Sequence, residues 1–359
     1  MDDTLKHLRS RIDSLDDALL QLLSERARVA QEVGRAKNGD TIYRPEREAQ
    51  IVSRLYGANP GPLPNDSIER IFREIMSSCR ALEQNLRVAY LGPPGTFSQS
   101  ALYKQFGHGV EALPEADIDS CFRAVETGRA DFAVVPVENS TEGAVSRTLD
   151  LIVTSPLKIC GEIMLPIHQN LMGKTAGLED IRRVYAHAQS FAQCQKWLHR
   201  HLPYAERTHV TSNAEGARRA AVELEAAALG SEVAAELYGL SIIAHRLEDE
   251  ATNTTRFLVL GMHDAAASGR DKTSLVLGAP NQPGAIVKLL QPLADAGISM
   301  TKLESRPARS GSWEYLFFIV CEGHRHDIQL STTLAKIESY AVFMKILGSY
   351  PASSEGLEP

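Results

Sequence analysis

The chain has 359 residues, of which 43% are hydrophobic and 23% are charged, and its formal net charge is −7. This length is typical of two or three domains, each with its own core. The mild negative charge and the absence of a basic run argue against nucleic acid as a partner, because little in the sequence would neutralise a phosphate backbone.

The amino terminus and the cysteines indicate the compartment. Met1, Asp2 and Asp3 form an acidic start, no apolar signal segment follows, and no stretch approaches the length of a membrane span. We therefore expect a cytoplasmic protein with no membrane partner. The five cysteines contain no Cys-x-x-Cys pair and the close histidine pairs lack a third ligand, so we expect reduced thiols and no metal or cofactor.

The first expected element is one long helix over about residues 5–38. Apolar residues recur at spacings of three and four from Leu5 to Val33, as on one face of a helix. Such a helix would be roughly 50 Å long at 1.5 Å per residue, whereas a compact domain of this size has a radius of gyration of about 13 Å. We therefore expect the helix to pair with a partner chain.

Two shorter helices are expected next. Pro45 suits the first position of the second helix, and the prolines within residues 60–64 end it. Asp66 or Ser67 is expected to cap the third helix. The first domain is expected to cover residues 1–86.

Charged side chains interrupt the apolar faces of these helices. Arg26 lies in the seam of the first helix, and Lys37, eleven residues later, projects from nearly the same face. Arg9 lies well off that face, so in a pair of such helices it would reach into the pocket of the partner. Taken singly, each charge fits a solvated side chain or a helix end; together with Glu83 on the third helix, they suit a pocket for a dianion.

Residues 5–84 resemble the all-helical, intertwined chorismate mutase family. The matching positions are Leu8, Arg9, Ile12–Leu23, Glu25, Arg26, Val33, Gly34, Lys37, Arg44–Glu48, Ile75, Met76, Cys79 and Glu83. The resemblance implies a homo-oligomer of at least two chains. Catalysis of the chorismate rearrangement is then electrostatic and conformational, and it needs no covalent step.

The resemblance also implies roles for the charged residues. Arg9 of the partner chain, Arg26 and Arg47 would hold the two carboxylates of chorismate. Lys37 would donate to its ether oxygen, and Glu48 would accept from its ring hydroxyl. Glu83 stands where some relatives carry glutamine, and a carboxyl group can donate to the ether oxygen only when it is protonated.

From Arg87 onward, short β-branched runs alternate with helical stretches, which indicates α/β architecture with largely parallel strands. The expected strands are Val88–Leu91, Phe132–Val137, Val184–Ala186, Ala226–Gly230 and Thr255–Leu260. Polar residues follow several of them, at the ends where α/β folds bind ligands. The hydroxyl of Thr255 beside the cation Arg256 suits removal of a hydroxyl group from an anionic substrate.

Residues 88–262 resemble prephenate dehydratase. The matching segments are Gly92–Ser98, Pro136–Asn139 with Gly143, Gly161–Leu171, Gln189–Cys194 and Asn253–Phe257. The resemblance implies a domain over residues 87–264, with two α/β lobes arranged like the clamp of a periplasmic binding protein and the active site in the cleft.

The same resemblance implies roles in this second site. Thr255 would be the catalytic hydroxyl, and Arg256 would bind a carboxylate. The residues implied to orient prephenate are Glu138, Asn139, Ser140 and Gln193. Ala186 and Ala188 stand where relatives commonly carry serine and proline, which removes one hydroxyl group from the site and one restraint from its turn.

From Lys272 the expected order is strand, helix, strand, strand, helix, strand, which is a ferredoxin-like α+β unit over residues 272–350, followed by a disordered tail over 351–359. This part resembles the ACT regulatory domain. The positions that match its phenylalanine-binding motifs are Gly284, Ala285, Ile286 and Val287, and then Glu304, Ser305, Arg306 and Pro307. The resemblance implies feedback inhibition by L-phenylalanine bound between two such domains; the alternative is a purely structural dimerisation domain.

The sequence as a whole predicts a cofactor-free, bifunctional enzyme that converts chorismate to prephenate and prephenate to phenylpyruvate. Two alternatives stay open. A ligand-binding regulatory protein could combine a clamp with an ACT sensor, although Thr255 and Arg256 argue against it. A mutase fused to a prephenate dehydrogenase would need a dinucleotide-binding glycine loop after a strand, and this chain has none.

Overall fold

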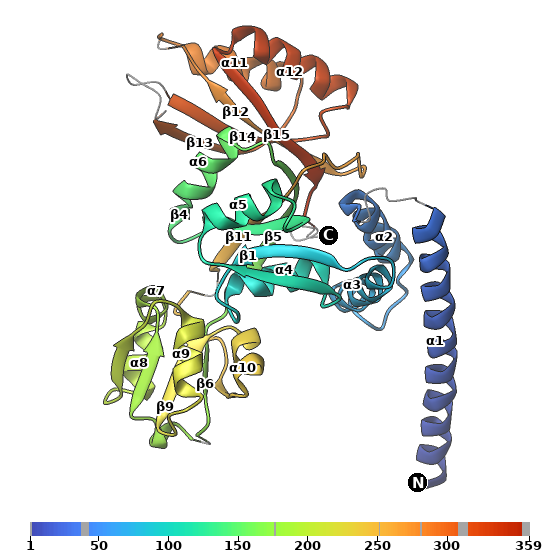
Figure 1. Cartoon of the computed structure of the whole chain (residues 1–359), viewed down its shortest axis with the longest axis vertical. Helices are drawn as coiled ribbons and strands as arrows, with labels where there is room; N and C mark the ends of the chain where they lie inside the picture. The colour runs from blue at the N-terminus through green and yellow to red at the C-terminus, as the bar shows by residue number, and fades with distance from the viewer. Residues whose placement is uncertain are drawn as a thin grey trace. The chain divides into compact units, whose positions relative to one another are not determined.

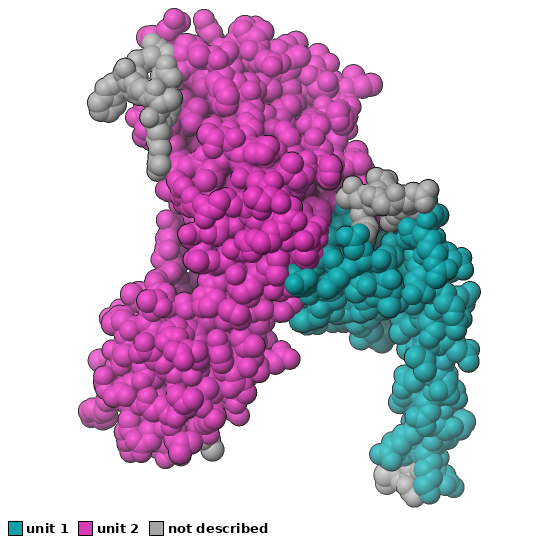
Figure 2. All heavy atoms as spheres, viewed as in Figure 1, with its two compact units in different colours: residues 1–44, 51–86, 105–111 teal, residues 45–50, 87–104, 112–359 magenta. Residues whose placement is uncertain are grey.

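The computed structural model describes residues 2–36, 43–175, 177–250, 252–280, 282–307 and 315–353. The chain divides into two compact units (Figure 2). The first unit contains Met1–Arg44, Ile51–Leu86 and Gln105–Glu111, and the second contains Pro45–Gln50, Arg87–Lys104 and Ala112–Pro359. Within the described residues, no helix combines the length and the hydrophobicity of a membrane span.

The first unit is helical and begins with α1, Asp2–Ala36, which confirms the expected long helix (Figure 1). Its 35 residues correspond to roughly 50 Å. The large apolar side chains of α1 that stay exposed within one chain are Leu5, Leu8, Ile12, Leu15, Leu19, Leu20, Leu22, Leu23, Val29 and Val33. An apolar face of this length is typical of a surface that binds another protein chain.

The two other helices are α2, Pro45–Ala58, and α3, Asn65–Ala81. Pro45 is the first residue of α2, as expected. The expected cap of α3 is wrong, because the N-cap lies two to three residues earlier, at Pro64, which has no side-chain hydrogen bond. The carbonyl oxygen of Pro64 accepts from the backbone N–H groups of Ser67 and Ile68 instead, at 3.0 and 3.2 Å.

Residues 105–111 belong to the same compact unit as α3. The Arg80 guanidinium donates to the carbonyl oxygen of Phe106 at 2.8 Å and lies 5.1 Å from the centre of the Tyr43 ring. Tyr43 and Phe106 are fully buried, with ring centroids 4.7 Å apart. The backbone N–H of Gly109 donates to the Ser77 hydroxyl at 2.9 Å. The helical unit therefore includes a segment that lies beyond the predicted domain boundary at residue 86.

The second unit contains two sheets and a C-terminal domain. The first lobe is built on the sheet β2-β1-β3-β11-β5, with β4 paired to β3. The strands of this sheet are β1 (Leu86–Leu91), β2 (Val110–Glu115), β3 (Phe132–Asn139), β4 (Gly143–Ala144), β5 (Lys158–Pro166) and β11 (Thr254–Gly261). The helices of the lobe are α4 (Phe97–Phe106), α5 (Ile118–Glu126) and α6 (Ser146–Thr154).

The second lobe is built on the sheet β10-β6-β9-β7-β8. Its strands are β6 (Asn170–Gly173), β7 (Arg183–Ala186), β8 (Glu206–His209), β9 (Ala226–Gly230) and β10 (Ser241–Ala244). Its helices are α7 (Ala188–Gln193), α8 (Gln195–His201), α9 (Asn213–Ala220) and α10 (Glu232–Tyr238), with a 3-10 turn at Leu178–Asp180. The expected two-lobed α/β arrangement is confirmed.

The expectation of largely parallel strands is wrong for part of both sheets. Strand β11 runs antiparallel to β3 and to β5, and β6 runs antiparallel to β9 and β10. The chain enters β11 from the second lobe and not through a helix packed on the same sheet, so the crossover that imposes parallel pairing is missing here. The strands β1 and β3, and β7 with β8 and β9, are parallel as expected.

Two segments connect the lobes, residues 167–169 and 245–253, and they are hydrogen-bonded to each other. The N–H of Ile167 donates to the carbonyl oxygen of Asn253 at 2.8 Å, and the N–H of Leu247 donates to the carbonyl oxygen of Gln169 at 2.8 Å. The Glu248 carboxylate also accepts from the N–H of Gln169 at 2.8 Å. These paired segments are the position at which one lobe would turn against the other.

The C-terminal domain has the expected ferredoxin-like order. Its elements are β12, Asp271–Gly278, α11, Ala285–Asp295, β13, Met300–Pro307, β14, Tyr315–Glu322, α12, Ile328–Tyr340, and β15, Phe343–Pro351. The sheet order is β13-β14-β12-β15, and both helices lie on one face of it (Figure 1). The predicted tail begins too early, because Pro351 ends β15 and the N–H of Ser353 donates to Glu162 at 3.3 Å; residues 354–359 lie outside the described residues.

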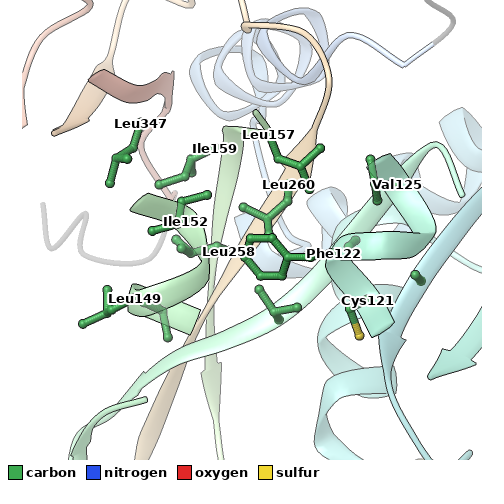
Figure 3. Close-up of a cluster of buried hydrophobic side chains, with 14 of the residues drawn as sticks. Cys121, Phe122, Val125, Leu149, Ile152, Leu157, Ile159, Leu258, Leu260 and Leu347 are labelled. Carbon is green, nitrogen blue, oxygen red and sulfur yellow. The ribbon is translucent and has the colours of Figure 1, made fainter. Parts of the chain in front are cut away.

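The C-terminal domain and the first lobe share one hydrophobic core. Leu347 on β15 packs in the same cluster as Ile159 on β5 and Leu258 on β11 (Figure 3). A Cβ atom at Gly348 would lie 2.2 Å from the carbonyl oxygen of Ile159, so only glycine permits this approach. The Lys345 ammonium donates to three carbonyl oxygens at the end of α6, at 2.6–3.0 Å. The first lobe and the C-terminal domain are therefore joined through packed side chains and backbone.

Candidate active site

A cleft of about 340 Å³ lies between the two lobes. The first lobe contributes Leu91, Gly92, Gly95, Thr96, Phe97, Ser98, Pro136, Asn139, Thr255 and Phe257, the second contributes Ser190, Gln193, Thr211, Ser212, Asn213, Ala214 and Ser231 with His187 and Gln189, and the connecting segments contribute Ile167, Gln169 and Asn253. The volume suits a small molecule.

Thr255 and Asn139 lie side by side at the floor of this cleft. They are directly paired across β11 and β3, so their side chains share one face of the sheet. The Asn139 side-chain amide donates to the Thr255 hydroxyl oxygen at 2.8 Å and to the Asn253 side-chain oxygen at 2.9 Å. Both N–H groups of this amide are then used, so the Thr255 oxygen is an acceptor and its own proton is left to donate elsewhere.

The orientation of the Asn139 amide is fixed from its other end. Its oxygen accepts from the hydroxyl of Thr141 at 2.6 Å, from the N–H of Thr141 at 3.0 Å and from the N–H of Glu142 at 3.3 Å. The pairing of β3 with β11 shifts register next to this site, where Phe257 pairs with Pro136 while Arg256 pairs with Glu138. Such bulges change the direction of side chains at a sheet edge and are common beside active sites.

Arg256, which the family resemblance implies to bind a carboxylate, is not among the residues that line the cleft. Its guanidinium binds the Glu162 carboxylate at 2.9 Å and donates to the Tyr350 hydroxyl at 3.0 Å, on the face of β11 opposite to Thr255. The Lys272 ammonium binds the second oxygen of Glu162 at 2.5 Å. Adjacent residues on a strand point to opposite faces, so Thr255 and Arg256 cannot both face the cleft.

The Glu162 side chain is fully buried. Burial disfavours its charged form, but the Arg256 and Lys272 cations outweigh burial and hold the pKa of this carboxyl below its ordinary value. The carboxylate is therefore ionised, and it connects β5 and β11 of the first lobe to β12 of the C-terminal domain.

Glu138 and Ser140 also lie outside the lining of the cleft, against expectation. The Glu138 carboxylate binds the Lys302 ammonium of β13 at 2.5 Å. The Ser140 hydroxyl donates to the carbonyl oxygen of Thr252 at 3.3 Å and accepts from the N–H of Thr254 at 3.0 Å. Both residues hold the backbone on either side of Asn139 and Thr255.

Gln193 lines the cleft from the second lobe, as expected, and it belongs to a polar network that sequence reasoning missed in part. The Gln169 amide donates to the side-chain oxygen of Gln193 at 3.2 Å. The Asn213 amide donates to the Ser190 hydroxyl at 2.7 Å, and its oxygen accepts from the N–H of His187 at 2.9 Å. Their positions just after strands are the signal that predicts such residues.

The turn that lacks the usual proline is held by other groups. His187 is the N-cap of α7, and its ring nitrogen accepts from the N–H of Gln189 at 3.3 Å. Ala188 is the first residue of that helix. The contact from Asn213 holds the same turn from the neighbouring loop, so two hydrogen bonds hold the turn in this chain, which has alanine at 186 and 188.

The described lining of the cleft contains amides and hydroxyls, and His187 is its one titratable side chain. None of the described residues that line the cleft is a lysine, arginine, aspartate or glutamate. Helices α4 and α9 begin at the cleft, next to Thr96 and Ser212. The free N–H groups and the dipole at a helix N-terminus favour an anion, and the amides and hydroxyls of the lining supply further donors.

The residues of the first candidate constellation are distributed over three helices. Arg9 is exposed and Arg26 is half-buried, both on α1, while Arg47 and Glu48 occupy the first turn of α2. A Cβ atom at Gly34 would lie 2.8 Å from Cγ of Glu83, so Glu83 lies directly against α1. Lys37 lies outside the described residues.

Distances along α1 decide which of these residues can act together. Arg9 and Arg26 are seventeen residues apart, which is roughly 25 Å on a helix, and Gly34 is farther still. One small substrate near Arg26 and Glu83 therefore cannot contact Arg9 of the same chain.

The two motifs of the C-terminal domain, residues 284–287 and 304–307, follow or form the C-terminal ends of two strands of its sheet. Gly284, in the left-handed conformation at φ 78°, precedes α11, whose first turn contains Ala285, Ile286 and Val287. The segment Glu304–Pro307 ends β13. Strands β12 and β13 are both antiparallel to β14, so they are parallel to each other and their C-terminal ends lie on the same side.

Comparison with known proteins finds three family models along the chain. A model of chorismate mutase type II matches residues 8–84, one of prephenate dehydratase matches residues 88–265, and one of the ACT domain matches residues 273–339. The bifunctional chorismate mutase/prephenate dehydratase of Neisseria gonorrhoeae is 52% identical over 98% of this chain and 98% of its own.

Two solved structures have a similar fold. The prephenate dehydratase of Arthrobacter aurescens, in complex with L-Phe, is 32% identical over 74% of this chain and 90% of its own, with a TM-score of 0.68. GqqA, a quorum-quenching acylase, is 31% identical over 75% of this chain and 98% of its own, also with a TM-score of 0.68.

Proposed function

The chain belongs to the family of bifunctional chorismate mutase/prephenate dehydratases, and from this premise we propose that it rearranges chorismate to prephenate and converts prephenate to phenylpyruvate, under feedback inhibition by L-phenylalanine. The cysteines are all free and buried, which suits a protein of the reducing cytoplasm.

The hydrogen bond from Asn139 to Thr255 is the observation that supports the second reaction best. When prephenate loses its ring hydroxyl as water, the C–O bond breaks toward oxygen and that oxygen needs a proton. The ring carboxylate leaves as carbon dioxide, and the electron pair of its C–C bond completes the aromatic ring. Thr255, whose oxygen already accepts from Asn139, donates its hydrogen bond to the leaving hydroxyl.

A free threonine hydroxyl is a very weak acid, so full proton release from it is not required by this proposal. The donor bond from Asn139 polarises the Thr255 O–H group, and a chain of such bonds strengthens each member. The leaving hydroxyl takes up one proton to become water, and that proton comes from solvent through the Thr255 hydroxyl, because the Asn139 amide polarises this hydroxyl but cannot itself supply a proton.

The absence of a cation from the described lining of the cleft fits the loss of carbon dioxide. A cation held against the ring carboxylate would stabilise the substrate more than the transition state, in which that charge disappears. Amides and helix N-termini hold the anion less tightly, and they suit the side-chain carboxylate that remains in phenylpyruvate. Asn139 and Gln193 are proposed to orient the substrate, while Glu138, Ser140 and Arg256 hold the strands.

For the first reaction we propose a pocket shared by two chains. Arg26, Lys37 and Arg47 supply cations and Glu48 accepts from the ring hydroxyl, as the family resemblance implies. Arg9 comes from the partner chain, which is supported by its distance from Arg26 on α1 and by the exposed apolar face of that helix. Glu83, beside Gly34, acts on the ether oxygen.

The regulatory ligand is proposed to bind at the edge of the C-terminal sheet. Residues 284–287 begin the helix that follows β12, residues 304–307 end β13, and the C-terminal ends of these two parallel strands lie on the same side. A second copy of the domain would complete the site, as the resemblance implies.

One set of assays tests the proposed function. Wild type, Arg26→Ala and Thr255→Ala are each given chorismate or prephenate, and phenylpyruvate is followed by absorbance. We expect Arg26→Ala to lose turnover of chorismate but keep that of prephenate, and Thr255→Ala to form prephenate and stop there. If wild type binds these ligands without turnover, the protein is a ligand-binding regulator and the proposal fails.

A further inference from the structure

The strand pair β3 and β11 has a catalytic face and a regulatory face. Thr255 pairs with Asn139 on the side of the cleft, and the neighbouring residues Arg256 and Glu138 pair with each other on the opposite side. On that side both residues bind the C-terminal domain. If this domain displaces either strand, the neighbouring residue of that strand, Thr255 or Asn139, is therefore displaced in the cleft as well.

The contact of β11 with the C-terminal domain is deeply buried. The Arg256 side chain is 11% exposed and that of Glu162 is not exposed at all. Lys272 and Tyr350 complete the cluster, and Tyr350 also shares a hydrogen bond of 2.7 Å with Ser274. Because breaking a buried ion pair leaves an uncompensated charge, this cluster holds β11 in place.

The contact of β3 with the C-terminal domain is nearer the surface. The side chains of Lys302 and Glu138 are 16% and 36% exposed, so this ion pair is more accessible than the pair between Arg256 and Glu162, although the Lys302 nitrogen itself is covered. Lys302 lies on β13, the edge strand of the sheet, two residues before the segment Glu304–Pro307. Farther along the same strand, Arg306 donates to the carbonyl oxygen of Ser146 at 2.7 Å.

We propose that the Lys302–Glu138 ion pair transmits the occupancy of the amino-acid site on β13 to the hydrogen bond between Asn139 and Thr255. This inference rests on the proposed function. The strand β11 is fixed by its buried cluster, whereas β3 is linked to the effector strand β13 through one ion pair that is less buried. A shift of β13 thus moves Asn139 relative to Thr255 and changes the polarisation of the catalytic hydroxyl. Lys302 is a positioning residue that touches no substrate.

The test uses the full-length protein and the variant Lys302→Met, which keeps the length of the side chain and removes its charge. The matched control is Lys336→Met, on the exposed surface of α12. Dehydratase rates with prephenate are measured with and without saturating L-phenylalanine, and L-phenylalanine binding is measured by calorimetry. We expect Lys302→Met to bind L-phenylalanine within about twofold of wild type, while the inhibition ratio falls at least fivefold.

A second measurement exchanges the charges of Lys302 and Glu138 and follows the inhibition by L-phenylalanine. Lys302→Glu and Glu138→Lys should each lose inhibition, and the double variant should regain it, because the ion pair is restored in reverse. Each inhibition ratio is taken against the same variant without effector. The inference is overturned if Lys302→Met binds L-phenylalanine and is inhibited as wild type, or if it loses binding altogether. A wild type without activity or inhibition contradicts the proposed function instead.

Discussion

Thr255 and Arg256 are neighbours in sequence, but their side chains leave β11 on opposite faces. The threonine lines the cleft and accepts a hydrogen bond from Asn139, whereas the arginine lies in a buried cluster with Glu162 and Tyr350. One residue serves the reaction and the other fastens the catalytic strand to the C-terminal domain.

The role of the Thr255 hydroxyl is tested by two substitutions, one that removes the hydroxyl and one that keeps it. Thr255→Val removes the hydroxyl and keeps the shape, and we expect kcat for prephenate to fall by about 10²- to 10⁴-fold, the usual contribution of a proton donor. Thr255→Ser keeps the hydroxyl and should retain most of the rate. Steady-state kinetics with prephenate decide between a donor and an orienting role, because an orienting role of the hydroxyl would raise KM in Thr255→Val and leave its kcat near wild type.

The Glu162 cluster predicts a stability difference that depends on pH. Glu162→Gln leaves Arg256 and Lys272 without their shared counter-charge, and loss of a buried partner costs about 3–5 kcal/mol. Because the folded-state pKa of Glu162 is lowered, its contribution is present above the ordinary value of about 4.3 and is lost as pH falls through the lowered pKa. The free energies of unfolding of wild type and variant should therefore converge in acid.

Denaturant unfolding between neutral and acidic pH measures this convergence. The control is Glu206→Gln, which breaks an exposed ion pair with Arg183 and should change the free energy of unfolding little at any pH. A Glu162→Gln protein as stable as wild type at neutral pH would show that the cluster does not hold the strand.

Gly34 predicts a selective loss of the mutase reaction. A methyl group at Gly34 would meet Cγ of Glu83 at 2.8 Å, so Gly34→Ala must displace the Glu83 side chain. We expect at least a tenfold loss of chorismate turnover, with prephenate turnover unchanged. Gly57→Ala is the matched control, because a Cβ atom there meets nothing within 4 Å and alanine favours the helix.

Glu83 predicts the shape of the mutase pH profile. A carboxyl group donates to the ether oxygen only when protonated, so wild-type mutase activity should fall as pH rises. Glu83→Gln donates at any pH and should flatten the alkaline side of the profile. Measured rates from pH 5 to pH 9 test this, and a variant that keeps the wild-type profile would exclude Glu83 from that role.

The helical periods, the strands β1, β3, β7, β9 and β11, and the order of the C-terminal domain were predictable from local pattern, whereas the other strands of the two lobes were not predicted. The spacing from Leu5 to Val33 predicts α1, and Pro45 marks the start of α2. The direction of Arg256 was predictable as well, since a residue next to Thr255 on a strand must face the other way. The sequence interpretation overlooked that alternation.

Other features depend on contacts between distant residues and leave little local signal. Asn253 meets Asn139 across more than a hundred residues, and Glu162 meets Arg256 across ninety-four. The antiparallel direction of β11 depends on the path of the chain through the second lobe. Nothing in the composition of residues 105–111 marks them as neighbours of α3.

The cluster of Tyr43, Arg80 and Phe106 limits how enzymes of this kind can be recombined. A gene fusion that joins foreign mutase helices at residue 86 would preserve the reading frame, yet it would replace the arginine that binds the Phe106 carbonyl oxygen and the ring that covers Phe106. Such a chimaera would expose an aromatic side chain that is fully buried in the native chain. Successful exchange in the laboratory, or by recombination between lineages, must therefore carry residues 105–111 together with the helices.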